Sequence, residues 1–284
     1  LGKSFVWARR TATFFECSDA DITIAYHYRL RVLWLHLKST PFGHVLTEFL
    51  YAVPWSGPHG SINCAYGHHA ADARWLRDIA ILDNYSSFWF VHPKADRRYT
   101  WWPSRAAIER FRLDGGLEVL RNLYPHLKAE YSRWIAWSKA AQHDCLWQAC
   151  HDDGEENSIG LDGCRPSINA AMAGEAAALA TMASLLGEER STIEEYRSDE
   201  IRWRRALHSL WDETLQFFVT RTYPPPESRQ EAIRKRRTKV GKLYSPPGPC
   251  PPKWKNGERV NVRELMGLSW PFYHQQASPE HAVA

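Results

Sequence analysis

Four carboxylates lie within five positions near the middle of the 284-residue chain: Asp152, Asp153, Glu155 and Glu156. Like charges this close repel one another, so one member of the group is expected to hold a proton near neutral pH. A carboxyl that is protonated there can donate its proton to the leaving oxygen of a glycosidic bond. Arg165 follows in the sequence and could orient a sugar hydroxyl or a carboxylate.

The residues of this acidic stretch leave other interpretations open. Acidic, glycine-bearing segments are often solvated connections between helices, and some bind calcium. The spacing here does not fit an EF-hand loop. On the residues alone, a solvated connection therefore stays open beside acid catalysis.

The chain is unusually rich in aromatic residues, with 14 Trp, 12 Tyr and 11 Phe. Flat aromatic rings suit the apolar C–H faces of sugars, as they suit other ring ligands. Most of these rings are expected to form a large core, and a few in loops are candidates for contacts with a sugar.

The cysteines do not form a recognisable metal or disulfide pattern. His143, Cys145, Cys150 and His151 cluster in the sequence, but their spacing matches none of the usual structural zinc patterns. The six cysteines are expected to be free, buried thiols. No metal and no cofactor are predicted.

Charge and hydropathy argue against two classes of partner. The formal net charge of +4 at pH 7 is small for this length and does not call for a nucleic acid. The basic run at residues 229–242 is expected to be a solvated loop. A nucleic-acid-associated helical protein that uses the charges of residues 234–237 remains an alternative. No run of about eighteen apolar residues occurs, so no membrane partner is predicted.

Apolar residues recur at helical spacing along most of the chain. The sequence predicts helices at residues 18–38, 62–77, 79–90, 102–113, 117–137, 167–186 and 191–210. Pro125 is expected to kink or split the fifth of these. Sequential helix pairs with little strand signal indicate an all-α fold built from helical hairpins.

A proline-rich, basic segment at residues 222–259 interrupts this pattern. Its runs of proline cannot lie inside a helix, so the segment is expected to be an extended surface insertion. The whole chain, residues 1–284, is otherwise interpreted as one domain.

Four stretches together resemble hydrolases related to glycoside hydrolase family 63, the group that includes mannosylglycerate hydrolases and processing α-glucosidases. They are PWSGPHGSINCAYGHHAADARWLRD at residues 54–78, RRYTWWPSRAAIERF at 97–111, DGEENSIGLDGCRPSINAAMAGEAAALATMASLLG at 153–187 and VNVRELMGLSWPFY at 260–273. The resemblance covers nearly the whole chain apart from the proline-rich segment. It implies that the chain forms part of an (α/α)6 toroid of six helical hairpins.

The resemblance also implies an activity, the hydrolysis of a glycosidic bond with inversion. Glu156 falls where the family keeps its general acid, and Glu264 is the nearby candidate for the second carboxylate. The side chains expected to line the sugar subsites are Trp55, His68, His69, Arg74 and Trp75, with Arg165 beside them. The implied partner is a carbohydrate substrate.

One departure from the family pattern affects the expected activity. In the family the base follows a Trp-x-Gly-Pro-x-Trp-Pro-like stretch, and this sequence stops before any such segment. The chain is therefore interpreted as a C-terminally truncated copy. A non-catalytic carbohydrate-binding or scaffold derivative of the same barrel stays open as the alternative function.

Overall fold

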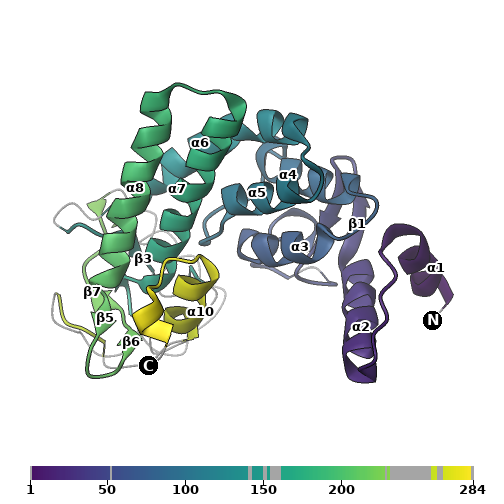
Figure 1. The fold of residues 1–284 in the computed structure, drawn as a ribbon, viewed down its shortest axis with the longest axis horizontal. Coiled ribbons are helices and arrows are strands. Elements are labelled where there is room, and N and C mark those ends of the chain that lie inside the picture. The colour runs from purple at the N-terminus through teal and green to yellow at the C-terminus, as the bar shows by residue number, and fades with distance from the viewer. Residues whose placement is uncertain are drawn as a thin grey trace. The chain divides into compact units, whose positions relative to one another are not determined.

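The computed structural model describes residues 2–51, 53–139, 143–149, 152–153, 161–227, 229–230, 257–260 and 265–282. The chain divides into two compact units, residues 1–123 and 124–284, with the boundary inside one helix. Each unit is built mainly from helices (Figure 1).

The first unit begins with helices α1 (Gly2–Thr11) and α2 (Ala20–His36). Asp19 caps α2, since its Oδ1 accepts hydrogen bonds from the backbone N–H groups of Asp21 at 2.9 Å and Ile22 at 3.3 Å. After α2 the chain forms an antiparallel hairpin of strands β1 (Leu37–Thr40) and β2 (Gly43–Leu46). The sequence predicted α2 to within two residues at each end but neither α1 nor the hairpin.

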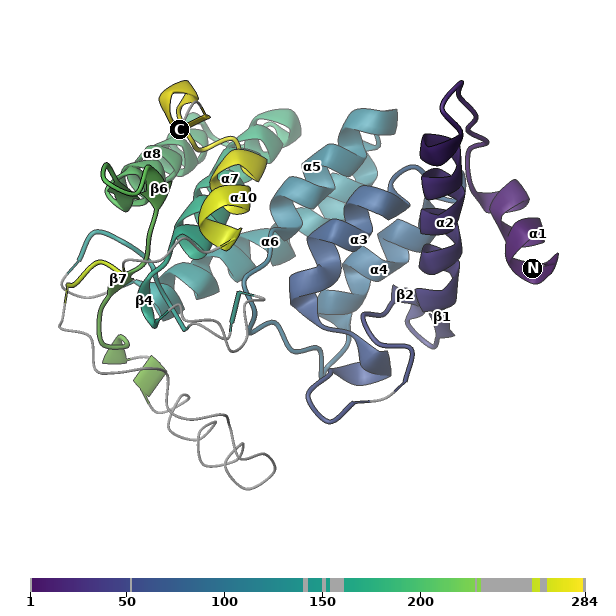
Figure 2. The ribbon, with the colours of Figure 1, turned by 90° about the horizontal axis from the view of Figure 1, so that it is seen from below.

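Three further helices complete the first unit: α3 (Tyr66–Ala73), α4 (Ala80–Val91) and α5 (Pro103–Asp114). The last two match the predicted helices to within one residue at each end. The prediction at 62–77 was too long, because two short 3-10 turns, Pro58–Gly60 and Asn63–Ala65, precede α3. Helix α3 packs against α5 (Figure 2).

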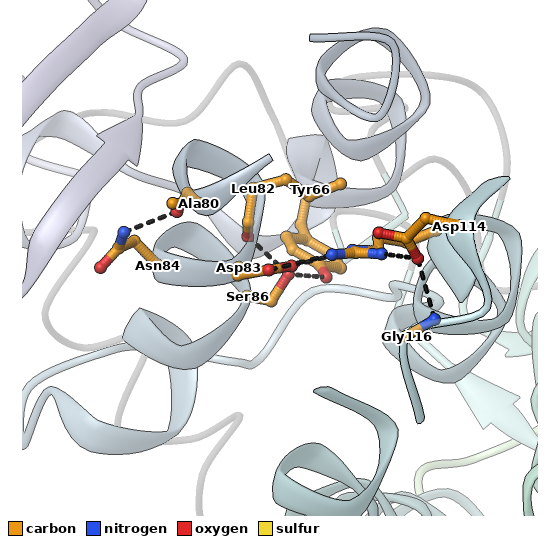
Figure 3. Close-up of polar contacts among 9 residues, drawn as sticks. Tyr66, Ala80, Leu82, Asp83, Asn84, Ser86, Asp114 and Gly116 are labelled. Carbon is orange, nitrogen blue, oxygen red and sulfur yellow. Dashed lines mark hydrogen bonds and ion pairs between the residues drawn. The ribbon is translucent and has the colours of Figure 1, made fainter. Parts of the chain in front are cut away.

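Polar contacts join these helices. The Tyr66 hydroxyl of α3 lies 2.8 Å from the Ser86 hydroxyl of α4. Arg110 of α5 donates two hydrogen bonds to the Asp83 carboxylate of α4, at 3.0 and 3.1 Å. Figure 3 shows Asp83 and, at the end of α5, Asp114, whose carboxylate accepts from the Gly116 backbone at 2.9 Å. The large buried side chains around these contacts are Tyr85, Phe88, Trp89, Trp101 and Trp102.

Helix α6 (Leu117–Ser138) runs through Pro125 without a break. The expected split at this proline is wrong. Helices α7 (Pro166–Leu186) and α8 (Arg190–His208) form the hairpin of the second unit, side by side in Figure 1. Gly187, in the left-handed region with φ +76°, ends α7.

Alanine makes α7 a close-packing helix, as its composition predicted, and most of its residues are buried. Helix α10 (Leu265–Tyr273) packs against it, as Figure 2 shows. The His274 ring lies over Gly174 of α7, where a Cβ would come within 2.7 Å of the His274 Nδ1 atom.

Short strands tie the second unit together. Strands β3 (Trp147–Gln148), β4 (Gly163–Cys164) and β7 (Arg221–Thr222) form an antiparallel sheet in that order, and β5 (Trp211–Asp212) pairs with β6 (Phe217–Phe218). The chain ends its described part in a 3-10 turn, Pro279–Ala282. The all-α, helical-hairpin class predicted from the sequence is confirmed.

Two further expectations concern cysteines and hydropathy. Cys145 and Cys164 form a disulfide, with Cα atoms 5.9 Å apart, so the expectation of free thiols is wrong for this pair. Cys17 and Cys64 form no disulfide and are half-buried, so the expected full burial is wrong for these two. Cys150 and Cys250 lie outside the described residues. Within the described ranges no helix has the length and apolarity needed to cross a membrane.

Most of the predicted insertion at residues 222–259 also lies outside the described residues. The two stretches that flank it are joined. The Thr222 backbone N–H donates to the Glu258 carbonyl at 3.0 Å, and the Gly257 N–H donates to the Thr222 carbonyl at 2.7 Å. The two ends of the predicted insertion therefore lie side by side in the second unit.

Candidate active site

The acidic stretch belongs to the connection between strands β3 and β4. Trp147 pairs with Cys164 and Gln148 with Gly163 in the antiparallel ladder. A disulfide also joins Cys145, which lies just before β3, to Cys164 of β4. Of the four carboxylates, the structure describes Asp152 and Asp153; Glu155 and Glu156 lie outside the described residues. Both described carboxylates are buried.

Asp153 is held by the residues that follow the stretch. Its Oδ2 accepts from Arg165 Nε at 2.6 Å and from the Ser167 hydroxyl at 2.7 Å. Arg165 is 0% exposed and also donates to the Leu161 carbonyl at 3.0 Å. The contact between Asp153 and Arg165 joins the residues on either side of the segment 154–164, which contains Glu156.

Asp152 is held from a different part of the chain. Arg229 donates to its Oδ2 at 2.6 Å and to the Gln148 side-chain oxygen at 2.9 Å. The Gln148 amide in turn donates to the Asp152 carbonyl at 2.9 Å. The Arg229 guanidinium lies 4.0 Å from the ring centroid of Trp137 and 5.0 Å from that of Trp147, positions that suit cation–π attraction.

Asn169 attaches the first turn of α7 to Leu146, the residue before β3. Its side-chain oxygen accepts from the Leu146 N–H at 2.9 Å, and its amide donates to the carbonyls of Leu146 at 3.0 Å and Arg165 at 2.8 Å. Asn169 is fully buried. The sequence Arg-Pro-Ser-Ile-Asn thus uses its three polar side chains to fix the start of α7. Arg165 and Ser167 bind the β3–β4 connection, and Asn169 binds Leu146, which directly precedes β3.

The ion pairs that Asp152 and Asp153 form with arginines were not foreseen from the sequence. Four crowded carboxylates were expected to repel one another. Instead, two of them face arginine side chains at short distance, so their charges are compensated inside the protein. Each of these two carboxylates thus has an arginine partner, and the expected repulsion among all four stays a prediction.

Sequence reasoning overlooked Gln148, Arg229 and Asn169. Arg229 was counted only as the first charge of a solvated basic run, yet it is 2% exposed. The one available signal was the clustering of polar residues around the buried helix start, Arg-Pro-Ser-Ile-Asn. Nothing in the local sequence indicates that Arg229 pairs with a residue 77 positions away.

The two predicted catalytic carboxylates, Glu156 and Glu264, both lie outside the described residues. Glu156 falls in the β3–β4 connection in sequence, and Glu264 directly precedes α10, which begins at Leu265. Their roles stay predictions.

In the first unit, Asn63 ties together the two loops that carry family-like motifs. Its amide donates to the Tyr99 carbonyl at 2.6 Å, and its oxygen accepts from the Tyr99 N–H at 3.2 Å. These loops lead into α3 and α5.

The backbone before α3 is unusual. His59 has φ +61° and Gly60 φ +78°, and the left-handed region is uncommon for a histidine. Such backbone often marks functional loops.

The predicted sugar-binding residues of the first unit have varied surroundings. Trp55 is 58% exposed, with its ring edge-on to Phe49. His68 is exposed and edge-on to Trp102, with ring centroids 5.0 Å apart. Both have a face available to a ligand.

His69 is half-buried, and its Nδ1 lies 3.1 Å from the Tyr85 hydroxyl. Desolvation by the surrounding protein, reinforced by the nearby positive charges of His36, His68 and Arg29, lowers the pKa of His69 to about 4. This ring is therefore neutral at pH 7.

Arg74 and Trp75 directly follow α3. Arg74 forms an ion pair with Glu109 of α5, and its guanidinium lies 5.3 Å from the ring centroid of Trp75. Trp75 itself is 56% exposed. Arg74 therefore has a structural partner, whereas Trp75 presents its ring to solvent.

Comparison with known proteins adds the family context. A model of the mannosylglycerate hydrolase MGH1-like glycoside hydrolase domain matches residues 57–284. A solved structure named "Sialidase" is 27% identical, with a TM-score of 0.81, and the match covers 99% of this chain and 24% of that chain. The chain thus spans about a quarter of the length of that structure. No curated protein matches the sequence.

Proposed function

Because the chain belongs to the mannosylglycerate hydrolase MGH1-like glycoside hydrolase domain family, we propose that it hydrolyses a glycosidic bond by an inverting acid/base mechanism. The substrate is a carbohydrate. Glu156 acts as the general acid and Glu264 as the second carboxylate.

The observation that carries this proposal is the anchoring of the acidic stretch. Two buried ion pairs, Asp153–Arg165 and Asp152–Arg229, fix residues next to Glu156 in the sequence. A catalytic acid must be placed to within about 0.5 Å of its working position, and surrounding residues locked by packing and hydrogen bonds provide such placement. A solvated connection would not need buried arginines at its base.

The proposed reaction requires two carboxyl groups on opposite faces of the sugar. Glu156 donates its proton to the glycosidic oxygen as the bond to the anomeric carbon breaks. Glu264 accepts a proton from a water molecule, whose oxygen attacks the anomeric carbon from the other face. The product then carries the inverted configuration. Inverting enzymes separate the two groups by roughly 6.5–9.5 Å to admit the water.

The two arginines predicted to contact the sugar have partners within the protein instead. Arg165 was expected to contact the sugar, but its complete burial and its bonds to Asp153 and Leu161 support a positioning role instead. The ion pair of Arg74 with Glu109 supports the same role for Arg74. Trp55 and His68, which are exposed, remain the proposed sugar contacts of the first unit. Trp75 is exposed as well but lines a separate pocket, which contains neither of them.

The proposal is tested by a turnover screen with aryl glycosides and oligosaccharides, followed by Glu156→Gln and Glu264→Gln. Each substitution should lower kcat by about a hundredfold or more, since general acid–base groups contribute about 10²–10⁴. NMR of the first-formed sugar should show inversion at the anomeric carbon. The matched control is Glu195→Gln, at an exposed position on α8, which should keep full turnover.

Unchanged turnover in Glu156→Gln would remove this residue from the site. Retention of configuration would overturn the inverting mechanism. Binding of oligosaccharides without any turnover by the unmodified protein would favour the non-catalytic alternative.

A further inference from the structure

The first unit contains a pocket that includes neither proposed catalytic carboxylate; of the side chains predicted to line the sugar subsites, Trp75 lies in it. It has a volume of about 550 Å³ and lies between the segment that links α1 to α2, helix α2 and the end of α3. We call it the aromatic pocket, because four of its lining residues are aromatic: Phe14, Phe15, Tyr26 and Trp75. Arg29 and Asp72 line it as well.

The walls of the aromatic pocket are fixed by hydrogen bonds between distant parts of the unit. The Tyr26 hydroxyl of α2 donates to the Thr13 carbonyl. The Thr13 hydroxyl donates to the Trp75 carbonyl at 3.4 Å, and the Arg77 N–H donates to the Thr11 carbonyl at 2.7 Å. The linking segment is therefore attached to both α2 and the end of α3, and the pocket between them is preformed.

The rings of the pocket offer apolar surface that is open to solvent. Phe14 is 69% exposed and Trp75 is 56% exposed. Phe15 and Tyr26 are tilted at 44° with their centroids 5.1 Å apart. These two rings do not form the parallel slot that suits a flat heterocycle stacked between two faces.

The polar groups of the pocket are a cation and an anion side by side. Arg29 and Asp72 form an ion pair at the surface of the unit. A phosphate or another anion would meet the negative charge of Asp72. A wholly apolar ligand would remove both charged groups from water without replacing their hydrogen bonds, which is unfavourable.

We propose that the aromatic pocket is a second carbohydrate-binding site, which takes a neutral hexose unit of an oligosaccharide. A pyranose ring has apolar C–H faces for the Trp75 and Phe14 rings and hydroxyls at its edge. The Asp72 carboxylate accepts hydrogen bonds from such hydroxyls, and the Arg29 guanidinium donates to them. The volume lies within the range of ligand pockets, about 300–1,000 Å³.

This inference rests on the proposed function only for the class of ligand, and it concerns binding instead of turnover. A site of this kind would hold a polysaccharide or oligosaccharide on the protein independently of bond cleavage. The two proposals can therefore fail separately.

The test measures binding of maltotriose, cellotriose and mannotriose by isothermal titration calorimetry and saturation-transfer NMR. The Glu156→Gln protein is used as the background, so that cleavage does not consume the probes. The expected result is saturable binding of at least one trisaccharide, weakened at least tenfold by Trp75→Ala and by Asp72→Asn. Phe14→Ala, at the most exposed ring of the pocket, provides a second aromatic variant should Trp75→Ala not fold.

The matched control is Tyr28→Ala, which removes an exposed aromatic ring of α2 that does not line the pocket. It should leave the affinity unchanged. Binding that is unaffected by the Trp75, Phe14 and Asp72 substitutions, or no binding of any probe, would overturn the pocket proposal. The proposal would also be overturned if the unmodified protein were a dimer and Trp75→Ala a monomer, because the pocket would then be a contact between copies of the chain.

The outcomes also separate the two proposals. Trisaccharide binding that depends on Trp75, in a protein whose unmodified form cleaves no glycoside, supports the aromatic pocket and contradicts the proposed function. Turnover that depends on Glu156, with trisaccharide affinity unchanged in Trp75→Ala, supports the proposed function and overturns the pocket.

Discussion

Arg229 and Asp152 are 77 residues apart in the sequence, yet the Arg229 guanidinium donates to the Asp152 carboxylate over 2.6 Å. Both side chains are almost fully buried. The contact connects the acidic stretch to the start of the proline-rich segment, two parts of the chain that the sequence gives no reason to associate. Because both side chains are buried, water cannot reach either one to replace its partner.

Breaking this pair should strongly destabilise the protein. Arg229→Met removes the cation and leaves the Asp152 carboxylate buried without it, so the free energy of unfolding should fall by about 3–5 kcal/mol. Urea denaturation followed by circular dichroism measures the change. The double variant Arg229→Met/Asp152→Leu should recover part of the loss, because no uncompensated charge remains.

A surface pair of the same unit provides the control. Arg202 and Asp144 also form an ion pair, but both side chains are well exposed, so Arg202→Met should cost less than about 1 kcal/mol. Equal effects of Arg229→Met and Arg202→Met would show that burial of the first pair has no energetic consequence.

The helices could be predicted from the sequence because their signals are local. The position of α4 follows from apolar spacing, and α5 in addition begins at Pro103 and is ended by Gly115. Helix α6 shows the limit of this reasoning. Pro125 lies in its interior, and only the three-dimensional surroundings decide whether a helix tolerates the missing hydrogen bond.

The candidate site could be located from the sequence but not built from it. The acidic stretch and the motif Arg-Pro-Ser-Ile-Asn were found together, and Asp153 does pair with Arg165 of that motif. The partner of Asp152, however, comes from elsewhere in the chain. Arg165 illustrates the difficulty: a conspicuous arginine next to acidic residues suits a substrate contact and an internal anchor equally well. Its complete burial distinguishes the two, and burial is a property of the fold.

Gly67 should be intolerant of any side chain. It lies in α3 under the Trp102 indole, and a Cβ at this position would overlap that ring. Both residues are buried, so Gly67→Ala should lower the free energy of unfolding by about 1–3 kcal/mol through overpacking, measured by urea denaturation. Combining it with Trp102→Phe relieves the overlap, and the double variant should be less destabilised than the sum of the two single variants. Strict additivity would contradict the contact.

His69 should make the stability of the protein fall as the pH is lowered from 7 to 5. The unfolded chain binds a proton on this ring near the usual pKa of 6.5, whereas the folded protein keeps the pKa at about 4. Between these values unfolding takes up a proton, so acid favours the unfolded state. The contribution lost between pH 7 and pH 5 is about 2 kcal/mol.

This prediction is checked by urea denaturation at several pH values with His69→Gln and a control. His69→Gln should flatten the pH dependence, while His126→Gln, at an exposed position of α6, should leave it as in the unmodified protein. NMR titration of the histidine Cε1 protons should show a ring that stays neutral down to about pH 4. A stability profile that is the same with and without His69 would contradict the assignment.

The proline-rich segment should be removable, provided that Arg229 is kept. Backbone hydrogen bonds join Thr222 to residues 257–258, so residues 223–231 and a linker together need only close a loop whose ends already meet. Replacing residues 232–255 with a glycine–serine linker should change the free energy of unfolding by less than about 1 kcal/mol, because the closure entropy of a loop depends only weakly on its length. A longer deletion that also removes Arg229 should lower the free energy of unfolding by about 3 kcal/mol or more, since it removes the buried ion-pair partner of Asp152.

Limited proteolysis of the unmodified protein should cut first within residues 231–256. Protection of this segment from protease, or unfolding of the shorter deletion variant, would show that the segment belongs to the core of the second unit.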